Sequence, residues 1–458
     1  MMIAGEHPLR GRKKEKTGGR PESVGVVRPR FRRLSVRKEC FMEKYVIEGG
    51  RPLYGEVEIQ SAKNAVLPLL AASVLTDERV VIHNCPRIAD VLNMAGILSE
   101  LGCKVHFDGG DLSIESADAA NHEIPAALAK ELRSSVFMLG SVLSRFGRAR
   151  IAYPGGCDIG LRPIDLHLKG LRRLGVHIEE GGGYIDCTCG RTVGAEIVLD
   201  CPSVGATENI MLASVKAEGK TVIRNAAKEP EIVDLQNFIN RMGGKVRGAG
   251  SATIVIEGVK KLRGVEYTPI PDRIEAGTFL IACAMCGGSV SLKNARANNL
   301  DALLHKLCEI SCKIRAIDDK IDIECRERFA AKLIETTPYP GFPTDLQAPM
   351  TALACICEGS TVVVENLFET RFKHVPELIR MGADITVRGR SAFIRGVKKL
   401  RGADVCAGDL RGGAALTLAA VAAEGLSTVT DLSHIDRGYF AFEYKLRGLG
   451  ARIRRVRI

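Results

Sequence analysis

One phrase recurs six times along the chain: a helix-like run, a closing residue pair and two short alternating strands. The closing pair is Leu-Gly or Met-Gly in five copies and Ile310-Ser311 in the fourth, and the copies follow one another at intervals of 68 to 73 residues. Glycine just past a helix takes the left-handed conformation that ends the last turn, so each copy predicts a helix followed by a strand pair. Serine at the fourth position predicts a weaker cap.

Each copy also contains an Ala- and Leu-rich helix followed by a strand, as at 206–216 and 217–223. Alternating strands and helices imply layered α/β packing with right-handed crossovers. Six units of about 70 residues suit two domains of three, whereas solenoid repeats are usually shorter, about 20 to 50 residues. The extended segment 267–271 falls between the third and fourth copies, and we expect the domain boundary there.

The composition is that of a soluble globular protein, with 46% hydrophobic and 26% charged residues. Apolar stretches such as 66–75 are far shorter than the roughly 20 residues that a membrane span needs. The basic N-terminus has no apolar core behind it, so no secretory signal is indicated. We therefore expect a cytoplasmic protein.

Most of the net charge of +11 comes from residues 1–41, which hold 12 Lys and Arg against four Glu. This segment lacks apolar periodicity and is predicted to be disordered. We interpret it as a dispensable extension or as the product of a wrongly chosen upstream start. Nucleic-acid binding through this segment is the less favoured alternative.

The fifteen cysteines are too dispersed for a secreted disulfide framework and are expected to be mostly small buried hydrophobes. The pairs Cys187/Cys189 and Cys308/Cys312 lack the spaced second half that a structural zinc site needs. We therefore expect no metal and no cofactor.

Polar and charged residues gather where the apolar helix of each copy begins. Helix N-termini offer unpaired N–H groups and positive potential, which suit phosphate and carboxylate, and added Lys or Arg strengthens such a site. Solvated caps are the plain alternative for any one of them, but their recurrence at equivalent positions favours an anion-binding cleft. The residues are Lys63, Asn64, Arg133, Ser203, Gly205, Asp272, Arg273, Asp345 and Arg411.

The segment 153–163 has three glycines between two prolines, which is typical of a mobile loop with stiff ends. It carries Cys157 and Arg162. A nearby cation and exposed N–H groups would lower the pKa of the thiol and make it nucleophilic or acidic. An incidental cysteine in a surface turn is the alternative.

From about Lys44 to Arg455 the chain resembles the bacterial UDP-N-acetylglucosamine 1-carboxyvinyltransferases, enzymes of peptidoglycan synthesis. One matching phrase would be weak, but nine of them in order are specific. They are Ser61-Ala62-Lys63-Asn64-Ala65, Pro154-Gly155-Gly156-Cys157, Gly160-Leu161-Arg162-Pro163-Ile164-Asp165-Leu166-His167, Ser203-Val204-Gly205-Ala206-Thr207, Glu229-Pro230-Glu231-Ile232, Pro271-Asp272-Arg273-Ile274-Glu275, Phe342-Pro343-Thr344-Asp345, His374-Val375-Pro376-Glu377-Leu378 and His434-Ile435-Asp436-Arg437-Gly438-Tyr439.

The resemblance implies an α/β fold of two inside-out barrels, each with three βαβαββ units. Residues 43–62 would join 271–458 in one domain, and 63–270 would form the other, which carries the lid loop 154–163. The implied reaction moves the enolpyruvyl group of phosphoenolpyruvate to the 3-hydroxyl of UDP-N-acetylglucosamine through a tetrahedral ketal, with release of phosphate. The implied partners are these two small molecules, without nucleic acid or membrane, and the protein would be a monomer or a weak oligomer.

The resemblance also implies roles for single residues. The catalytic set would be Lys63, Cys157, Asp345 and Arg437, with Asp345 as a base of near-normal pKa and Cys157 as a lid thiol that forms a covalent adduct. Contacts to phosphoenolpyruvate would come from Lys63, Arg133, Arg162, Arg371 and Arg437, with Arg411 a further candidate. The UDP-sugar site would be lined by Asn64, Arg133, Arg162, Pro163, Ile164, Asp165, Leu166, His167, Ser203, Val204, Gly205, Asp345, Leu367 and Phe368, while Glu229 and Asp272 would lie near the hinge and cleft.

Two departures and two alternatives qualify this assignment. Cys201 stands where some relatives have lysine, so one phosphate contact would be missing or supplied elsewhere. The lid has Cys157 rather than aspartate, which predicts alkylation by the epoxide fosfomycin. A shikimate-pathway enolpyruvyl transferase is the nearest alternative enzyme, and a non-catalytic nucleotide-sugar-binding paralogue is the alternative of another class.

Overall fold

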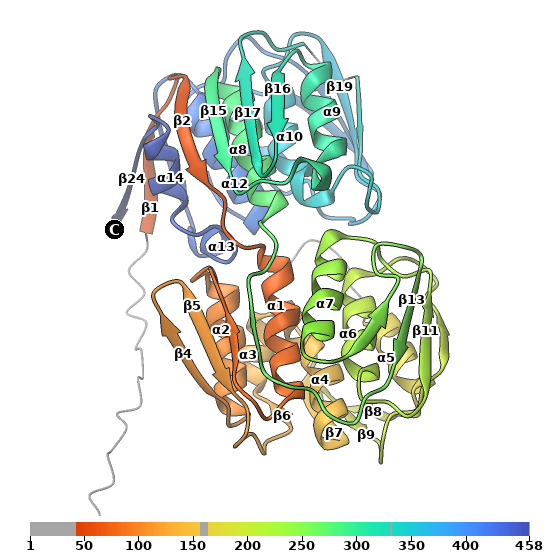
Figure 1. The fold of residues 1–458 in the computed structure, drawn as a ribbon. Coiled ribbons are helices and arrows are strands. Elements are labelled where there is room, and N and C mark those ends of the chain that lie inside the picture. The colour runs from red at the N-terminus through yellow and green to blue at the C-terminus, as the bar shows by residue number, and fades with distance from the viewer. Residues whose placement is uncertain (1–42, 156–163, 330–331, 458) are drawn as a thin grey trace, which may run out of the picture. The chain divides into compact units, whose positions relative to one another are not determined.

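The computed structural model describes residues 43–155, 164–329 and 332–457 (Figure 1). Their strands form six sheets of four strands, and every sheet has the same pairing: one parallel neighbour followed by two antiparallel ones. This common pattern confirms the six copies predicted from the sequence. In spatial order the first three sheets are β14 (Val265–Tyr267), β3 (Val80–Ile82), β5 (Asp111–Glu115) and β4 (Lys104–Asp108); β6 (Glu123–Ile124), β7 (Arg148–Ala152), β9 (Tyr184–Thr188) and β8 (His177–Gly181); and β10 (Glu196–Val198), β11 (Lys220–Arg224), β13 (Thr253–Glu257) and β12 (Lys245–Arg247).

The other three sheets contain the strands of the second half of the chain and two strands from its first described residues. They are β16 (Lys313–Ile317), β17 (Lys320–Cys325), β15 (Gly288–Lys293) and β2 (Leu53–Glu58); β18 (Leu333–Glu335), β19 (Ser360–Val364), β21 (Ser391–Arg395) and β20 (Asp384–Arg388); and β22 (Asp404–Cys406), β23 (Leu426–Thr430), β1 (Glu43–Glu48) and β24 (Arg452–Arg457).

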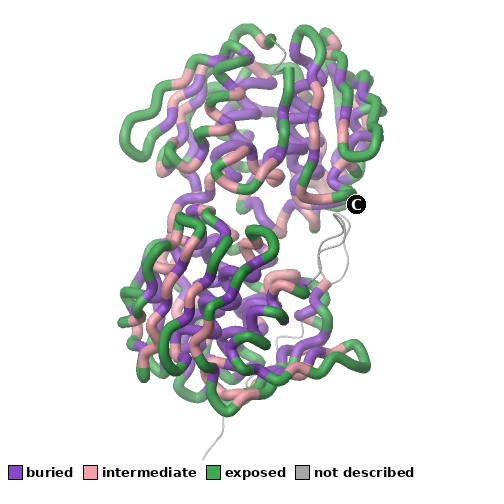
Figure 2. Tube along the Cα trace, turned by 90° about the vertical axis from the view of Figure 1, so that its right-hand side faces the viewer, coloured by how far each residue is buried: buried purple, intermediate pink, exposed green. Residues whose placement is uncertain are grey.

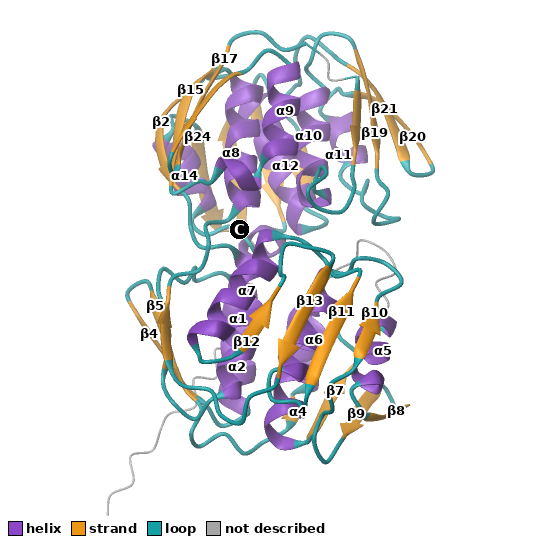
Figure 3. Cartoon of the chain, turned by 45° about the vertical axis from the view of Figure 1, so that its right-hand side comes forward, coloured by secondary structure: helices purple, strands orange, loops and turns teal. Residues whose placement is uncertain are grey.

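Six largely apolar helices are buried among the sheets, and α6 also buries the polar side chains of Thr207, Glu208 and Asn209. Figure 2 shows these buried segments in the interior, and Figure 3 shows the strands lying outside the helices, the inside-out α/β arrangement expected from the family. The helices are α1 (Lys63–Ala72), α4 (Phe137–Phe146), α6 (Val204–Ser214), α8 (Arg273–Cys286), α10 (Gln347–Ala354) and α12 (Leu410–Ala422).

A second set of six helices ends at the predicted caps: α2 (Ala89–Glu100), α5 (Asp165–Arg173), α7 (Pro230–Arg241), α9 (Asp301–Glu309), α11 (Val375–Arg380) and α14 (Phe442–Gly448). The capping residue has positive φ in all six copies, from 73° at Ser311 to 99° at Gly450. After each cap the next N–H donates to the carbonyl five residues back, as from Cys103 to Leu98. The cap geometry is confirmed, while the weaker cap at Ser311 stays a prediction. Shorter elements are α3 (Ala126–Glu131), α13 (Ser433–Asp436), η1 (Ser73–Leu75), η2 (Arg133–Val136), η3 (Ala297–Asn299) and η4 (Thr344–Leu346).

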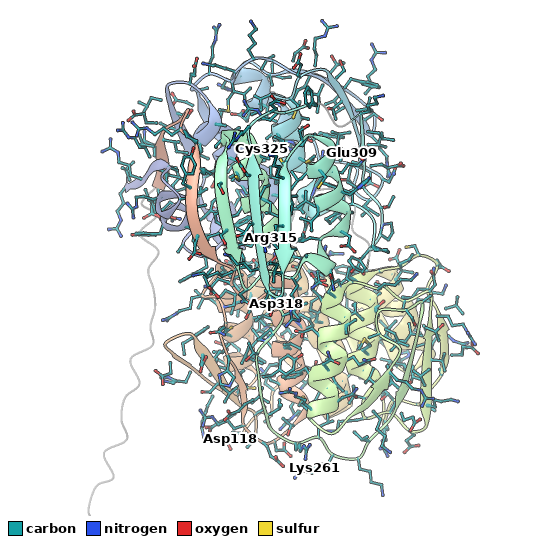
Figure 4. All side chains as sticks on the ribbon, turned by 45° about the horizontal axis from the view of Figure 1, so that its top comes forward. Asp118, Lys261, Glu309, Arg315, Asp318 and Cys325 are labelled. Carbon is teal, nitrogen blue, oxygen red and sulfur yellow. The ribbon has the colours of Figure 1, made fainter. Side chains whose placement is uncertain are left out.

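The outer faces of the sheets are solvated. Arg315 and Asp318 are exposed on the hairpin of β16 and β17, whereas Cys325 at the end of β17 is buried (Figure 4). Along β17 buried residues alternate with exposed or half-buried ones, which is the expected pattern for an antiparallel strand with one face on a core.

Two separate hydrophobic cores lie within residues 43–457. One is built from buried residues between Val66 and Tyr267, and the other from residues 45–59 together with 274–453. The second core includes the first strands because β1 pairs with β23 and β24, and β2 pairs with β15. We propose that each core marks one domain, with the boundaries near 62 and 271.

Candidate functional site

The residues predicted at the starts of the buried helices lie there in the structure. Two of them are side-chain caps, which satisfy N–H groups that a helix leaves unpaired. Ser203 accepts from the N–H of Ala206, and Asp272 accepts from the N–H groups of Ile274 and Glu275. Lys63 begins α1, Arg133 begins η2 ahead of α4, Asp345 lies in η4 ahead of α10, and Arg411 is the second residue of α12.

Asp90 gathers two of the predicted cationic residues. Its Oδ2 lies 3.2 Å from Lys63 Nζ, and its Oδ1 lies 2.8 Å from Arg437 Nε. The carboxylate of Asp90 is 2% exposed, while the two cations are 12% and 20% exposed. Lys63 starts a helix of one core and Arg437 follows α13 in the other, so one buried carboxylate holds a cation from each core.

Asp345 gathers two others. Arg371 Nη2 lies 2.5 Å from Asp345 Oδ1, and Arg411 Nη2 lies 3.1 Å from Oδ2. Both arginine side chains are 3% exposed, whereas that of Asp345 is 28% exposed. The N-cap Asp409 holds the start of α12 by accepting from the N–H groups of Arg411 and Gly412, which fixes the backbone from which Arg411 extends.

The charge around Asp345 governs its protonation. Burial by itself would raise the pKa of this carboxyl. The guanidinium charges of Arg411 and Arg371, together with the ammonium charge of Lys63, outweigh burial and hold the pKa well below its usual range. The near-normal pKa predicted from the sequence is therefore wrong. Its physical cause is the pair of buried arginines, whose approach to Asp345 depends on tertiary packing.

Two contacts join the two cores beside these clusters. The Lys63 N–H donates to Asp272 Oδ2 at 3.2 Å, so the first residue of α1 is tied to the cap of α8. Arg273 Nε lies 3.0 Å from Glu231 Oε1 in an almost fully buried ion pair between α8 and α7. Glu229 precedes α7, and burial raises the pKa of its carboxyl. Asp272 thus contacts the first residue of α1. The expected place of Glu229 near the hinge stays a prediction.

The described residues that were predicted for the UDP-sugar lie at the starts of α1, α5 and α6, in η2 and η4, and in one loop. Ile164 to His167 open α5, Ser203 to Gly205 open α6, and Asn64 is the second residue of α1. The His167 ring lies against Gly205, because a Cβ built on that glycine would come 3.1 Å from His167 Cε1. In the loop, the N–H groups of Leu367 and Phe368 donate to Glu365 Oε1.

The Phe368 ring is close to the Asp345 cluster, since its centroid lies 5.7 Å from Cζ of Arg371. Arg133 reaches the start of the predicted lid, where its Nη1 donates to the Pro154 carbonyl at 3.3 Å. Cys157, Arg162 and Pro163 lie outside the described residues. Cys201 is exposed two residues ahead of Ser203.

Sequence reasoning missed Asp90. It is an acidic residue in the first turn of α2, a position where Asp is common for its interaction with the helix dipole. An acidic residue on a helix that precedes a cap glycine gave no signal of two cationic partners from distant segments. Burial of a carboxylate is the informative feature, and only the structure shows it.

Within the described ranges, no helix combines the length and apolar character needed to cross the bilayer. The same residues contain no cluster of three or more His, Cys, Asp or Glu side chains arranged to hold a metal ion.

The chain matches the family model described as EPSP synthase (3-phosphoshikimate 1-carboxyvinyltransferase) over residues 47–446. UDP-N-acetylglucosamine 1-carboxyvinyltransferase 2 of Caldanaerobacter subterraneus subsp. tengcongensis is 55% identical over 416 residues, which cover 91% of this chain and 100% of the relative. UDP-N-acetylglucosamine 1-carboxyvinyltransferase 1 of Clostridium acetobutylicum is 48% identical with the same coverage.

Two solved structures share the fold. The enolpyruvyl transferase NikO from Streptomyces tendae matches with a TM-score of 0.83 at 25% identity, covering 91% of this chain and 100% of that one. EPSP synthase from Acinetobacter baumannii matches with a TM-score of 0.71 at 18% identity and the same coverage, which shows the fold alone. The family model, the near-complete coverage of the curated relatives and the six-copy fold agree, and the chain belongs to the family of UDP-N-acetylglucosamine 1-carboxyvinyltransferases.

Proposed function

We propose that this protein transfers the enolpyruvyl group of phosphoenolpyruvate to the 3-hydroxyl of UDP-N-acetylglucosamine and releases phosphate. The observation that carries the proposal is the pairing of Lys63 and Arg437 on one buried carboxylate, because it brings cations from both cores to one place. Two polyanionic reactants repel each other, so a site that brings them together needs several fixed cations. The names of the curated relatives support the choice of acceptor.

In the proposed reaction the sugar hydroxyl attacks C2 of phosphoenolpyruvate while C3 takes up a proton, which gives a tetrahedral ketal. Loss of a proton from C3 and departure of phosphate then complete the transfer. Lys63, Arg162 and Arg437 hold the carboxylate and phosphate of phosphoenolpyruvate, with Arg133 and Arg371 in support. Their positive charge stabilises the negative charge that develops on the reacting groups.

Asp345 is the proposed base for the sugar hydroxyl. Its pKa is low because two arginines surround it, so the residue is ionised and ready to accept a proton. A carboxylate with a very low pKa is a weak base, and its basicity rises when an anionic reactant shares the charge of Arg371 or Arg411. Binding of the reactants would thus turn Asp345 into a better proton acceptor.

The remaining roles follow the family pattern. Cys157 is proposed as the lid thiol that delivers a proton to C3 or assists product release, and as the site of a covalent adduct with phosphoenolpyruvate or fosfomycin. The UDP-sugar is proposed to lie between the starts of α5 and α6 and the loop with Leu367 and Phe368. This activity would place the protein in the cytoplasm, in peptidoglycan synthesis and, through it, in cell-wall growth and division.

Phosphate release from phosphoenolpyruvate tests the proposal. Release should require UDP-N-acetylglucosamine and should not occur with shikimate 3-phosphate, the acceptor implied by the description of the family model. Lys63→Met should lower kcat/KM by at least about 100-fold. Lys104→Met removes a lysine that is exposed and paired with Asp118, and it should leave the rate unchanged. Equal release with either acceptor, or none with both, would reject the assignment.

A further inference from the structure

Asn209 lies on α6 and is fully buried, and its side-chain amide has an unambiguous orientation. Its Oδ1 lies 2.8 Å from the backbone nitrogen of Gly140 on α4. A backbone N–H can only donate, so the amide atom that faces it must be the oxygen. The Nδ2 of Asn209 then faces His167, 3.1 Å from its Nδ1.

This orientation decides the protonation of His167. The NH₂ group of Asn209 can only donate, so Nδ1 of His167 must carry a lone pair. A neutral imidazole with a lone pair on Nδ1 carries its proton on Nε2. If Nδ1 were protonated, its N–H and the NH₂ group of Asn209 would be two donors pointing at each other. Both are buried, so neither could donate to water instead.

The Nε2 edge of the ring lies at the first turn of α6. A Cβ built on Gly205 would come 3.1 Å from His167 Cε1 and 3.3 Å from Nε2, so the absence of a side chain lets the imidazole approach the backbone. His167 itself is 7% exposed and sits in the first turn of α5. Any hydrogen-bond partner of Nε2 must be an acceptor, because that nitrogen carries the proton.

We infer that Asn209 is a positioning residue, which holds His167 as the Nε2–H tautomer so that it donates a hydrogen bond to a phosphate oxygen of the nucleotide sugar at the start of α6. The inference rests on the proposed function for the identity of the ligand, whereas the tautomer itself rests only on the contacts of the folded protein. The two hydrogen bonds that link Gly140, Asn209 and His167 would thus present the Nε2–H of His167 to the diphosphate as a donor rather than an acceptor.

The tautomer is measured directly by ¹⁵N NMR on protein labelled at its nine histidines. The resonance pair that disappears in His167→Gln identifies the residue. We expect the Nδ1 signal at the position of an unprotonated nitrogen and the Nε2 signal at that of a protonated one at neutral pH. A protonated Nδ1 would overturn the inference whether or not the enzyme is active.

Asn209→Asp tests the positioning role, because it keeps the acceptor for the Gly140 N–H and replaces only the donor to His167. The carboxylate should draw the proton of His167 to Nδ1, which the same NMR signals report. We expect the KM for UDP-N-acetylglucosamine to rise about tenfold, with kcat and the KM for phosphoenolpyruvate changed less than about twofold.

Asn240→Asp is the matched control, since Asn240 also accepts from one backbone N–H and donates to one backbone carbonyl, both of Val246. Its kinetic constants should equal those of the wild type. An unchanged KM for the nucleotide sugar in Asn209→Asp, or an equal loss in both constants, would reject the positioning role. A wild type without transferase activity would instead reject the proposed function and leave the NMR test standing.

Discussion

Asp90 and Asp345 each hold two cationic side chains, yet their surroundings differ. Asp90 is 2% exposed and binds one cation from each hydrophobic core. Asp345 is 28% exposed, and both of its arginines belong to segments of one core. A carboxylate sealed between two segments is suited to holding them in place, whereas one with access to ligand is suited to exchanging a proton. The contrast separates a structural link from a proposed base.

Of the variants that test this contrast, Asp345→Asn should have the largest effect, and the effect should be on kcat. An amide cannot accept the hydroxyl proton, so kcat should fall by at least about 100-fold with a smaller change in the KM for phosphoenolpyruvate. Steady-state phosphate release measures both constants. Asp322→Asn, on the half-buried middle of β17, is the control and should keep the wild-type rate. A kcat within about threefold of the wild type would remove Asp345 from the role of base.

Asp90→Asn should act mainly on stability and on the binding of phosphoenolpyruvate. The amide leaves Lys63 and Arg437 without their shared counter-charge, so the free energy of unfolding should fall by about 2 kcal/mol and the KM for phosphoenolpyruvate should rise. Denaturant unfolding and steady-state kinetics measure the two effects. The exposed Asp118→Asn should change stability by less than about 0.5 kcal/mol. If Asp90→Asn lost kcat as fully as Asp345→Asn, the two carboxylates would not differ in role.

Arg371→Gln should shift the pH dependence of the reaction. The base must be ionised, so activity is lost as pH falls through the pKa of Asp345, and removal of a neighbouring cation raises that pKa. We expect the acidic limb of the kcat profile to move to higher pH by about one unit. The guanidinium of Arg437 binds Asp90 instead of Asp345. Arg437→Gln should therefore lower the rate without moving the acidic limb of the kcat profile. Equal shifts in both variants would mean that the two clusters act as one.

The smallest effect is expected in the pH dependence of stability. The folded state holds the pKa of Asp345 below its ordinary value of 3.8, so the ionised carboxylate stabilises the fold above that pH. This contribution is lost as pH falls from 3.8 through the lower pKa of the folded state. The difference in unfolding free energy between wild type and Asp345→Asn should therefore shrink between about pH 5 and pH 2.5. A constant difference across that range would contradict the lowered pKa.

The pKa of Asp234 is shifted in the opposite direction, so this carboxyl tests the same measurement from the other side. Burial raises its pKa to about 6, against the opposing hydrogen bonds from Tyr267 and Ile270. The folded state thus binds the extra proton, and stability from this group falls as pH rises from 3.8 to about 6. Asp234→Asn removes that loss, so its stability relative to the wild type should rise over the same interval.

The repeat was readable in the sequence because its signals are local. A glycine that must adopt positive φ, an apolar helix and alternating strands each depend on a few neighbouring residues, and all six caps have the predicted geometry. The starts of the buried helices were predictable for the same reason. Ser203 and Asp272 are capping residue types, and both cap the helices that they precede.

Contacts between distant segments could not be predicted from such local signals. Asp90 and Arg437 are separated by 347 residues, and an acidic residue in a first helical turn does not indicate its partner. The pKa of Asp345 was misjudged because two buried arginines approach it, one from a turn and the other from α12. The Asn209–His167 contact joins residues 42 positions apart on two helices, and neither helix alone shows it.

The sequence by itself determined the six α/β units, the helix starts at which polar groups gather and the family to which the chain is similar. Each of these depends on short-range backbone preferences and on the order of motifs. Only the tertiary structure decided which cations share a carboxylate, how strongly Asp345 is held in its ionised form and which tautomer His167 adopts. Those properties depend on distance, burial and local charge, which packing between segments far apart in the chain sets.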